Sequence, residues 1–254
     1  MLLALLTDFG PSDPYVGVIK GVVLERRPDA AIVDLAHGIA AQNVRQAAFV
    51  LMQSLDYFPG GTLFLCVVDP GVGSDRRILW ARGSRHQFLA PDNGLLSWVE
   101  QRETLRELRS VTNRKLFNEP VSPVFHGRDI FAPVAAALAG GAAPDTLGPR
   151  VPDMVRFPFP EPRRSRGRLR GEIVVFDGFG NAVTNLRPGD IRARARFRHK
   201  GADLGPLRTH YAQAPEGQAL VLTGSSGYIE LSVRDGSFAR CAEASVGDPV
   251  EANP

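Results

Sequence analysis

Residues 60–73 read Gly-Gly-Thr-Leu-Phe-Leu-Cys-Val-Val-Asp-Pro-Gly-Val-Gly, and this stretch decides the fold predicted for the first half of the chain. Two glycines break the chain, the apolar run 63–68 follows, and an aspartate then opens a loop rich in glycine. A short apolar run between turn residues predicts a strand that is buried on both faces. Polar residues directly behind such a strand lie at its carboxyl end, where open α/β sheets bind their ligands.

Strand and helix signals alternate on both sides of this stretch. Apolar runs predict strands, and apolar residues at spacings of three and four predict helices. Asp13 and Pro14 provide an N-cap and a first helical residue for one of these helices. The expected strands are 2–6, 31–35 and 63–68 with a hairpin of 78–81 and 87–89, and the expected helices are 15–26, 44–55 and 129–138. The alternation predicts an α/β domain over residues 1–155, with a mostly parallel sheet covered by helices.

The character of the sequence changes after residue 155. Four prolines and four arginines between 151 and 166 predict an extended linker, which we place at 156–166. Helix signals then almost vanish, and short apolar segments alternate with Gly, Pro, Asp and Asn. The expected strands are 171–176, 217–223, 228–233 and 242–250. This pattern is typical of a compact β-barrel or sandwich, and we expect a smaller all-β barrel domain over 167–254.

Composition favours no macromolecular partner. The chain has 254 residues, of which 44% are hydrophobic and 22% charged, and its formal charge is +3. All but three of the basic residues are arginines, and the basic runs 163–166 and 192–200 are interpreted as solvated linker and loop. No reading motif for nucleic acid accompanies them. We therefore expect no nucleic-acid partner.

Targeting and metal signals are equally weak. No apolar run approaches the roughly 18 residues of a membrane span, and the apolar start 1–6 is shorter than a signal-peptide core. The expected location is the cytoplasm, with no membrane partner. Cys66 and Cys241 lie far apart, and no Cys/His spacing or HExxH motif indicates a metal site. We expect no metal and no cofactor.

Four clusters of polar residues and glycine follow apolar segments, and together they favour a functional site over isolated turns. Two of them echo kinase motifs, but Asp-Phe-Gly at 8–10 precedes His-Gly-Arg-Asp at 126–129, which is the reverse of the kinase order. The chain also has no complete dinucleotide fingerprint, no P-loop and no GxSxG elbow. The clusters lie at 7–13, 69–76, 126–129 and 177–181.

Taken together, the motifs resemble those of the SAM hydroxide adenosyltransferases, which hydrolyse S-adenosyl-L-methionine (SAM) and are relatives of the fluorinases. The resemblance extends from residue 2 to about residue 246, and the motifs follow one another in the same order. They are 6–10 with 13–17, 68–73, 90–94, 125–133, 177–181 and 225–228.

The resemblance implies hydrolysis of SAM to adenosine and L-methionine, by attack of water-derived hydroxide at C5′. It also implies an α/β domain with a smaller β-barrel, and a homotrimer with active sites between neighbouring subunits. By motif, the implied catalytic residues are Asp69, Arg76 and His126. The implied substrate contacts are Asp8 to the ribose hydroxyls, Asp177 to the methionine amine, Ser225 to its carboxylate, Asn181 to the adenine and Asp13 in the same pocket.

These residue types suit the reaction. The sulfonium leaves as a neutral thioether, so the difficulty lies in generating the nucleophile from water with a pKa near 15.7. Arg76 stays protonated and can favour hydroxide electrostatically. His126 titrates near neutrality and can accept the proton, while Asp69 orients and balances the pair. Asp129 is expected to cap the following helix rather than to take part in catalysis.

Two alternatives remain open at this point. A halide-dependent, chlorinase-like adenosyltransferase is disfavoured, because halogenating relatives lack the Asp69 motif and His126. A non-catalytic protein that binds SAM or adenosine is the other alternative. The sequence also departs from the family pattern at Gln42, where an aromatic residue is frequent, and at Val124, where Thr is common. Both departures affect the expected shape of the pocket.

Overall fold

The computed structural model describes residues 1–165, 167–192 and 194–253. Two compact units divide the chain, the first covering Met1–Pro158 and the second beginning at Phe159. Residues 166 and 254, which end the predicted linker and barrel domain, lie outside the described residues. No helix of the described chain is both long and apolar enough to cross a membrane.

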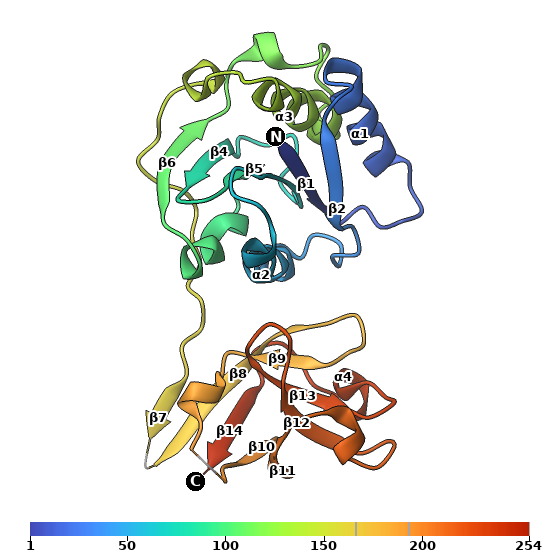
Figure 1. Ribbon diagram of the computed structural model, residues 1–254, viewed down its shortest axis with the longest axis vertical. Helices are drawn as coiled ribbons and strands as arrows, with labels where there is room; N and C mark the ends of the chain where they lie inside the picture. Colours follow the sequence, from blue (N-terminus) through green and yellow to red (C-terminus); the bar gives the residue numbers. More distant parts are fainter. Residues whose placement is uncertain (166, 193, 254) are drawn as a thin grey trace. The chain divides into compact units, whose positions relative to one another are not determined.

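The first unit contains the predicted mostly parallel sheet (Figure 1). Its six strands are arranged in the order β2-β1-β3-β5-β4-β6. The pairs β1–β2, β1–β3 and β3–β5 are parallel, and β4 pairs antiparallel with β5 and β6. The strands are β1 (Leu2–Thr7), β2 (Ala31–Ala36), β3 (Leu63–Val67), β4 (Ile78–Gly83), β5 (Gln87–Pro91) and β6 (Leu105–Ser110).

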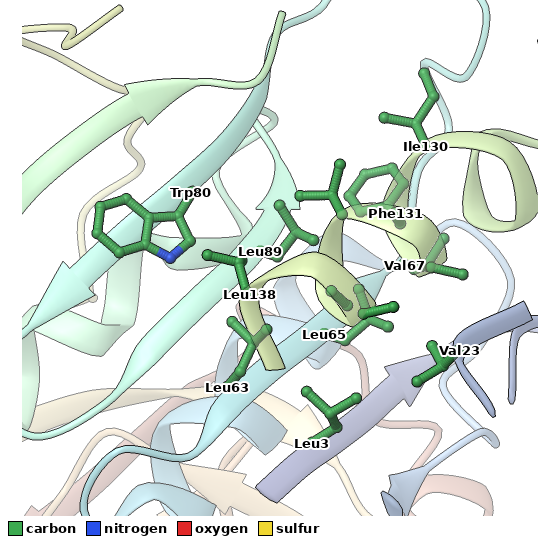
Figure 2. Close-up of a cluster of buried hydrophobic side chains, with 14 of the residues drawn as sticks. Leu3, Val23, Leu63, Leu65, Val67, Trp80, Leu89, Ile130, Phe131 and Leu138 are labelled. Carbon is green, nitrogen blue, oxygen red and sulfur yellow. The ribbon is translucent and has the colours of Figure 1, made fainter. Parts of the chain in front are cut away.

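Helices cover both faces of this sheet, because the central strands are apolar on both faces. Leu3, Leu65 and their neighbours pack against α1 and α3 in one core cluster, part of which is shown in Figure 2. Ala4, Phe64 and Cys66 pack against α2 and η2 in the other. The helices are α1 (Tyr15–Arg26), α2 (Val44–Ser54) and α3 (Ala132–Ala139), with the short helices η1 (Leu55–Tyr57), η2 (Leu95–Gln101), η3 (Arg114–Leu116), η4 (a π-helix, Gly127–Phe131) and η5 (Pro144–Leu147).

The N-cap predicted at Asp13 is wrong. Helix α1 begins at Tyr15 and its N-cap is Pro14, without a capping hydrogen bond from a side chain. Asp13 is exposed and lies in the bend before the helix. The cap predicted at Asp129 is also wrong, because this residue lies inside the π-helical turn that precedes α3.

The second unit is a seven-stranded barrel with one additional edge strand. Its hydrogen-bonded order is β14-β10-β11-β12-β13-β9-β8, and β14 pairs with β8 to close the ring. Strand β7 pairs antiparallel with β8 and is the additional edge strand. The elements are β7 (Arg163–Ser165), β8 (Arg168–Phe176), β9 (Ala182–Thr184), η6 (Pro188–Asp190), β10 (Arg196–His199), β11 (Ala202–Arg208), η7 (Tyr211–Gln213), β12 (Ala219–Thr223), β13 (Ile229–Val233), α4 (Phe238–Cys241) and β14 (Pro249–Asn253).

Two local predictions in this unit need correction. The strand expected at 242–250 is mostly turn, and the strand of this region is β14. The basic run at 192–200, interpreted as loop, contains strand β10. In β10 the arginines alternate with the buried Phe197 and His199, so the charges face outward and one side of the strand packs into the barrel.

Candidate active site

Arg76 joins two loops of the first unit through its guanidinium group. Its Nε donates to both carboxylate oxygens of Asp69 at 2.9 Å, and its Nη2 donates to Oδ2 of the same group. Nη2 also lies 2.8 Å from Nδ1 of His126. The side chains of Arg76 and Asp69 are only 10% and 5% exposed, so this ion pair is shielded from water. The structure thus brings together the three residues predicted to be catalytic.

The contact with Arg76 assigns the neutral tautomer of His126. A guanidinium N–H can only donate, so Nδ1 must accept and the proton of the neutral ring lies on Nε2. Burial lowers the pKa of His126 from its ordinary value, and the positive charge of Arg76 lowers it further. Asp69 and Asp129 act in the opposite direction. His126 is therefore neutral near pH 7.

A cavity of about 340 Å³ opens at the carboxyl ends of β1 and β3. Its walls include four of the predicted site residues, Asp8, Asp13, Asp69 and His126. Arg76 contacts two of these groups, although it does not itself line the cavity. Carboxylates, an imidazole and an apolar wall in one hollow are typical of a small-molecule site.

The apolar wall is built mainly by three aromatic rings. Phe9, Tyr15 and Phe125 all line the cavity and pack against one another with ring centroids 5.2–6.2 Å apart. Tyr15 was not selected from the sequence, although it directly follows the Asp13-Pro14 pair of a recognised motif. Val124 also lines the cavity and is 76% exposed.

Gln42 contributes to the cavity through its backbone as well as its side chain. Its φ is +64°, a left-handed conformation that is uncommon for a residue with a side chain. In this conformation its N–H donates to Oδ2 of Asp8 at 2.7 Å. The bond fixes the carboxylate and leaves its Oδ1 available to a ligand. Gln42 lines the cavity at the position where an aromatic residue is frequent in the family, so this part of the wall is polar.

The two loops that carry Arg76 and His126 touch at Gly73. This glycine has φ +80°, and a Cβ at this position would lie 2.3 Å from the carbonyl oxygen of Pro123. Both the backbone conformation and the close approach require glycine. The second glycine of the Asp-Pro-Gly-Val-Gly motif thus allows the loop 69–76 to pack against residues 122–125.

The site residues predicted in the second unit form a turn and an exposed loop. Asp177 Oδ1 accepts from the N–H groups of Phe179 and Asn181, and Oδ2 accepts from Nδ2 of Asn181 at 2.9 Å. Asp177 and Asn181 therefore adjoin, and each still has unused hydrogen-bonding capacity. Ser225 is exposed on the turn between β12 and β13. Phe179 is 82% exposed, so it does not pack in the core of this unit.

Two further observations concern motifs outside the cavity. Asp92, within the motif at 90–94, accepts from Arg77 at 2.7 Å and from the N–H of Val155 at 2.7 Å, which makes it a structural anchor. A hollow of about 460 Å³ beside β8 holds none of the predicted site residues. Within the described part of the chain, no three His, Cys, Asp or Glu residues are grouped so that they could hold a metal ion.

Both units of the chain are similar to known proteins. Residues 3–148 match the model of the SAM hydroxide adenosyltransferase N-terminal domain, and residues 171–251 match that of the C-terminal domain. A Thermus thermophilus protein named (R)-S-adenosyl-L-methionine hydrolase is 40% identical over 261 residues, which cover 96% of each chain. A protein from an Actinoplanes species named fluorinase is 29% identical and covers 91% of this chain and 90% of its own.

The fold is also similar to that of a solved structure. An uncharacterized conserved protein from Thermotoga maritima matches over the whole of both chains with a TM-score of 0.91 and 33% identity. The match covers both units, so the order of α/β unit and barrel is shared along the whole chain.

Proposed function

The chain belongs to the SAM hydroxide adenosyltransferase family, and on that premise we propose that it hydrolyses SAM to adenosine and L-methionine. The observation that carries the proposal is the buried contact of Arg76 with both Asp69 and His126, at a cavity lined by Asp8. A fixed cation beside a neutral imidazole is suited to preparing hydroxide from water. No other reaction step is required of the protein, because the thioether leaves without protonation.

Arg76 supplies the positive charge that favours hydroxide over water. Because the guanidinium is shielded from solvent, its electrostatic effect is larger than at an exposed position. The hydrogen bonds that Arg76 donates to both oxygens of Asp69 hold the guanidinium plane in one orientation. Asp69 thereby serves as the orienting group of the set.

His126 is the proposed proton acceptor, and the geometry places a condition on this role. Nδ1 accepts from Arg76 and Nε2 carries the proton, so the neutral ring has no unused lone pair. Proton transfer to Nδ1 therefore requires that water replace the Arg76 N–H at this nitrogen. The Nη2 N–H released by this exchange can then donate to the hydroxide, while the bonds to Asp69 keep the guanidinium in place.

Substrate contacts are proposed on the same basis. Asp8 accepts hydrogen bonds from the ribose diol through the oxygen that Gln42 leaves free, and Asp13 lies in the same cavity. The aromatic wall provides an apolar surface for the nucleoside. In the second unit, Asp177 binds the methionine ammonium, Ser225 its carboxylate and Asn181 the adenine.

The proposal also covers the oligomeric state, the cofactor requirement and the cellular location. We infer a homotrimer with active sites between neighbouring subunits, a reaction without cofactor, and a cytoplasmic location. Analytical ultracentrifugation at several protein concentrations tests the trimer. A monomer that turns over SAM at the full rate would contradict it.

The decisive experiment uses SAM in water enriched in ¹⁸O. Hydroxide attack at C5′ makes a new C–O bond and breaks the C–S bond, so the label must enter adenosine and not methionine. Mass spectrometry of both products measures this directly. Adenine or S-adenosylhomocysteine as the only product would refute the proposal, and binding of SAM without turnover would favour a sensor or carrier.

The relative named fluorinase favours one test of the halide alternative. Chloride attack would give 5′-chloro-5′-deoxyadenosine and unlabelled methionine. We expect adenosine in chloride buffer and in halide-free buffer alike. The variant His126→Ala should lose kcat with little change in KM, because the imidazole acts on the nucleophile rather than on SAM.

A further inference from the structure

Asp129 holds the segment that carries His126, although it lies outside the cavity lining. Asp129 is 3% exposed, and its carboxylate accepts the backbone N–H of Ser122 at 2.8 Å. Its main-chain carbonyl accepts the N–H of Asn118 at 2.9 Å. One residue of the π-helix thus binds the preceding loop at two points.

Arg128 fixes the orientation of this carboxylate. Its Nε and Nη2 donate to the two oxygens of Asp129 at 2.7 and 2.8 Å, and its guanidinium lies 5.3 Å from the ring centroid of Phe125. Phe125 is a wall residue of the cavity. The pair Arg128–Asp129 therefore contacts both the backbone and a ring of the segment 122–125.

This segment is the one that packs against the loop 69–76. The carbonyl of Pro123 faces Gly73 so closely that no side chain fits between them. His126 follows the segment directly, and its Nδ1 lies 2.8 Å from Arg76 on the other loop. A shift of the segment therefore changes the distance between His126 and Arg76.

We propose that Asp129 is a positioning residue for His126, because its bond to Ser122 holds the segment 122–125 against the loop that carries Arg76. The inference rests on the proposed function and extends it to a residue that does not touch the cavity. The proposed hydrogen bonds to substrate come from other groups, so we expect loss of Asp129 to lower kcat more than it raises KM.

Asp129 also acts on His126 through its charge. The charged groups around the imidazole are Arg76 and Asp69 from the facing loop and Asp129 from the π-helix, while Asp8 and Asp13 line the same cavity. Burial and Arg76 lower the pKa of His126, and the two aspartates Asp69 and Asp129 raise it. Removing the charge of Asp129 lowers this pKa further.

The test compares Asp129→Asn with a matched control, Asp92→Asn. Asp92 is also buried, pairs with its own arginine and accepts a backbone N–H at 2.7 Å, but it lies outside the cavity. With SAM as substrate, we expect Asp129→Asn to lose kcat at least tenfold and to raise KM by a smaller factor. Its acid limb of kcat should move to lower pH. The control should keep kcat within twofold and its acid limb unmoved.

Equal loss of kcat in the two variants would overturn the inference, as would a raised KM with unchanged kcat. NMR titration of the His126 ring gives a readout without turnover, and an unchanged midpoint in Asp129→Asn would also overturn it. If wild-type protein forms no adenosine, the proposed function fails, whereas the titration still tests the effect of the Asp129 charge on His126.

A second variant covers the case in which Asp129→Asn does not fold. Arg128→Met keeps the carboxylate and its bond to Ser122 but removes the neighbouring cation, from a side chain that is 40% exposed. The unbalanced charge of Asp129 should then raise the pKa of His126, whereas Asp129→Asn should lower it. A midpoint that stays in place would refute the inference.

Discussion

Replacing Gly73 by alanine tests whether the approach of the two loops sets the activity. The added Cβ would lie 2.3 Å from the Pro123 oxygen, whereas ordinary contacts begin near 3.4 Å, so the loops must separate by about 1.1 Å. A misplacement of about 1 Å can reduce turnover about 100-fold. We therefore expect kcat to fall by about two orders of magnitude. Adenosine release from SAM, followed by liquid chromatography, measures it.

The matched control is Gly141→Ala. Gly141 has φ +88°, close to the +80° of Gly73, but nothing lies within 4 Å of its added Cβ. The left-handed backbone should cost each variant about 1–2 kcal/mol of stability, which corresponds to a Tm lower by about 2–8 °C. Gly73→Ala should lose more than this, because its Cβ also meets the Pro123 oxygen. Only the variant at Gly73 should lose turnover. If both folded variants kept kcat within threefold of each other, the proposed dependence on loop separation would be wrong.

Three further predictions follow from burial and charge. The acid limb of kcat should have its midpoint below pH ~6.5, because the pKa of His126 is lowered and its neutral form is lost as pH falls. Arg76→Met should raise the NMR titration midpoint of the His126 ring, because it removes a positive charge that lowers this pKa. A lower midpoint would contradict the assigned cause. Iodoacetamide should label the exposed Cys241 of native protein and not Cys66, because burial raises the pKa of the Cys66 thiol far above its usual range. Mass spectrometry before and after unfolding checks this prediction. Labelling of Cys66 in folded protein would refute it. Phe131→Ala should lower the free energy of unfolding by about 3–5 kcal/mol, since this residue of the π-helix is fully buried in the core cluster that includes α1 and α3. Denaturant titration measures the loss, and a change under 1 kcal/mol would count against it.

Local sequence patterns were sufficient for five of the six strands of the first unit, and they missed β6, whose sequence Leu-Arg-Glu-Leu-Arg-Ser contains no apolar run. The run 63–68 is apolar at every position, and the strand it predicts is buried on both faces in the structure. Apolar burial along one strand depends on the residues of that strand, so it can be read without knowing the partners. The turn at 242–248 misled the same reasoning, because small apolar residues such as Ala242 and Ala244 also pack against a core from a turn.

What the sequence determined by itself is the family motifs, the mostly parallel sheet and the barrel that follows it. Only the tertiary structure decided that Nη2 of Arg76 reaches Nδ1 of His126, 50 positions away along the chain, and that Gln42 fixes Asp8 through its backbone. Periodicity and motif spacing record the preferences of neighbouring residues. The direction of a hydrogen bond, and with it the tautomer of His126, depends instead on where distant segments meet in the folded chain.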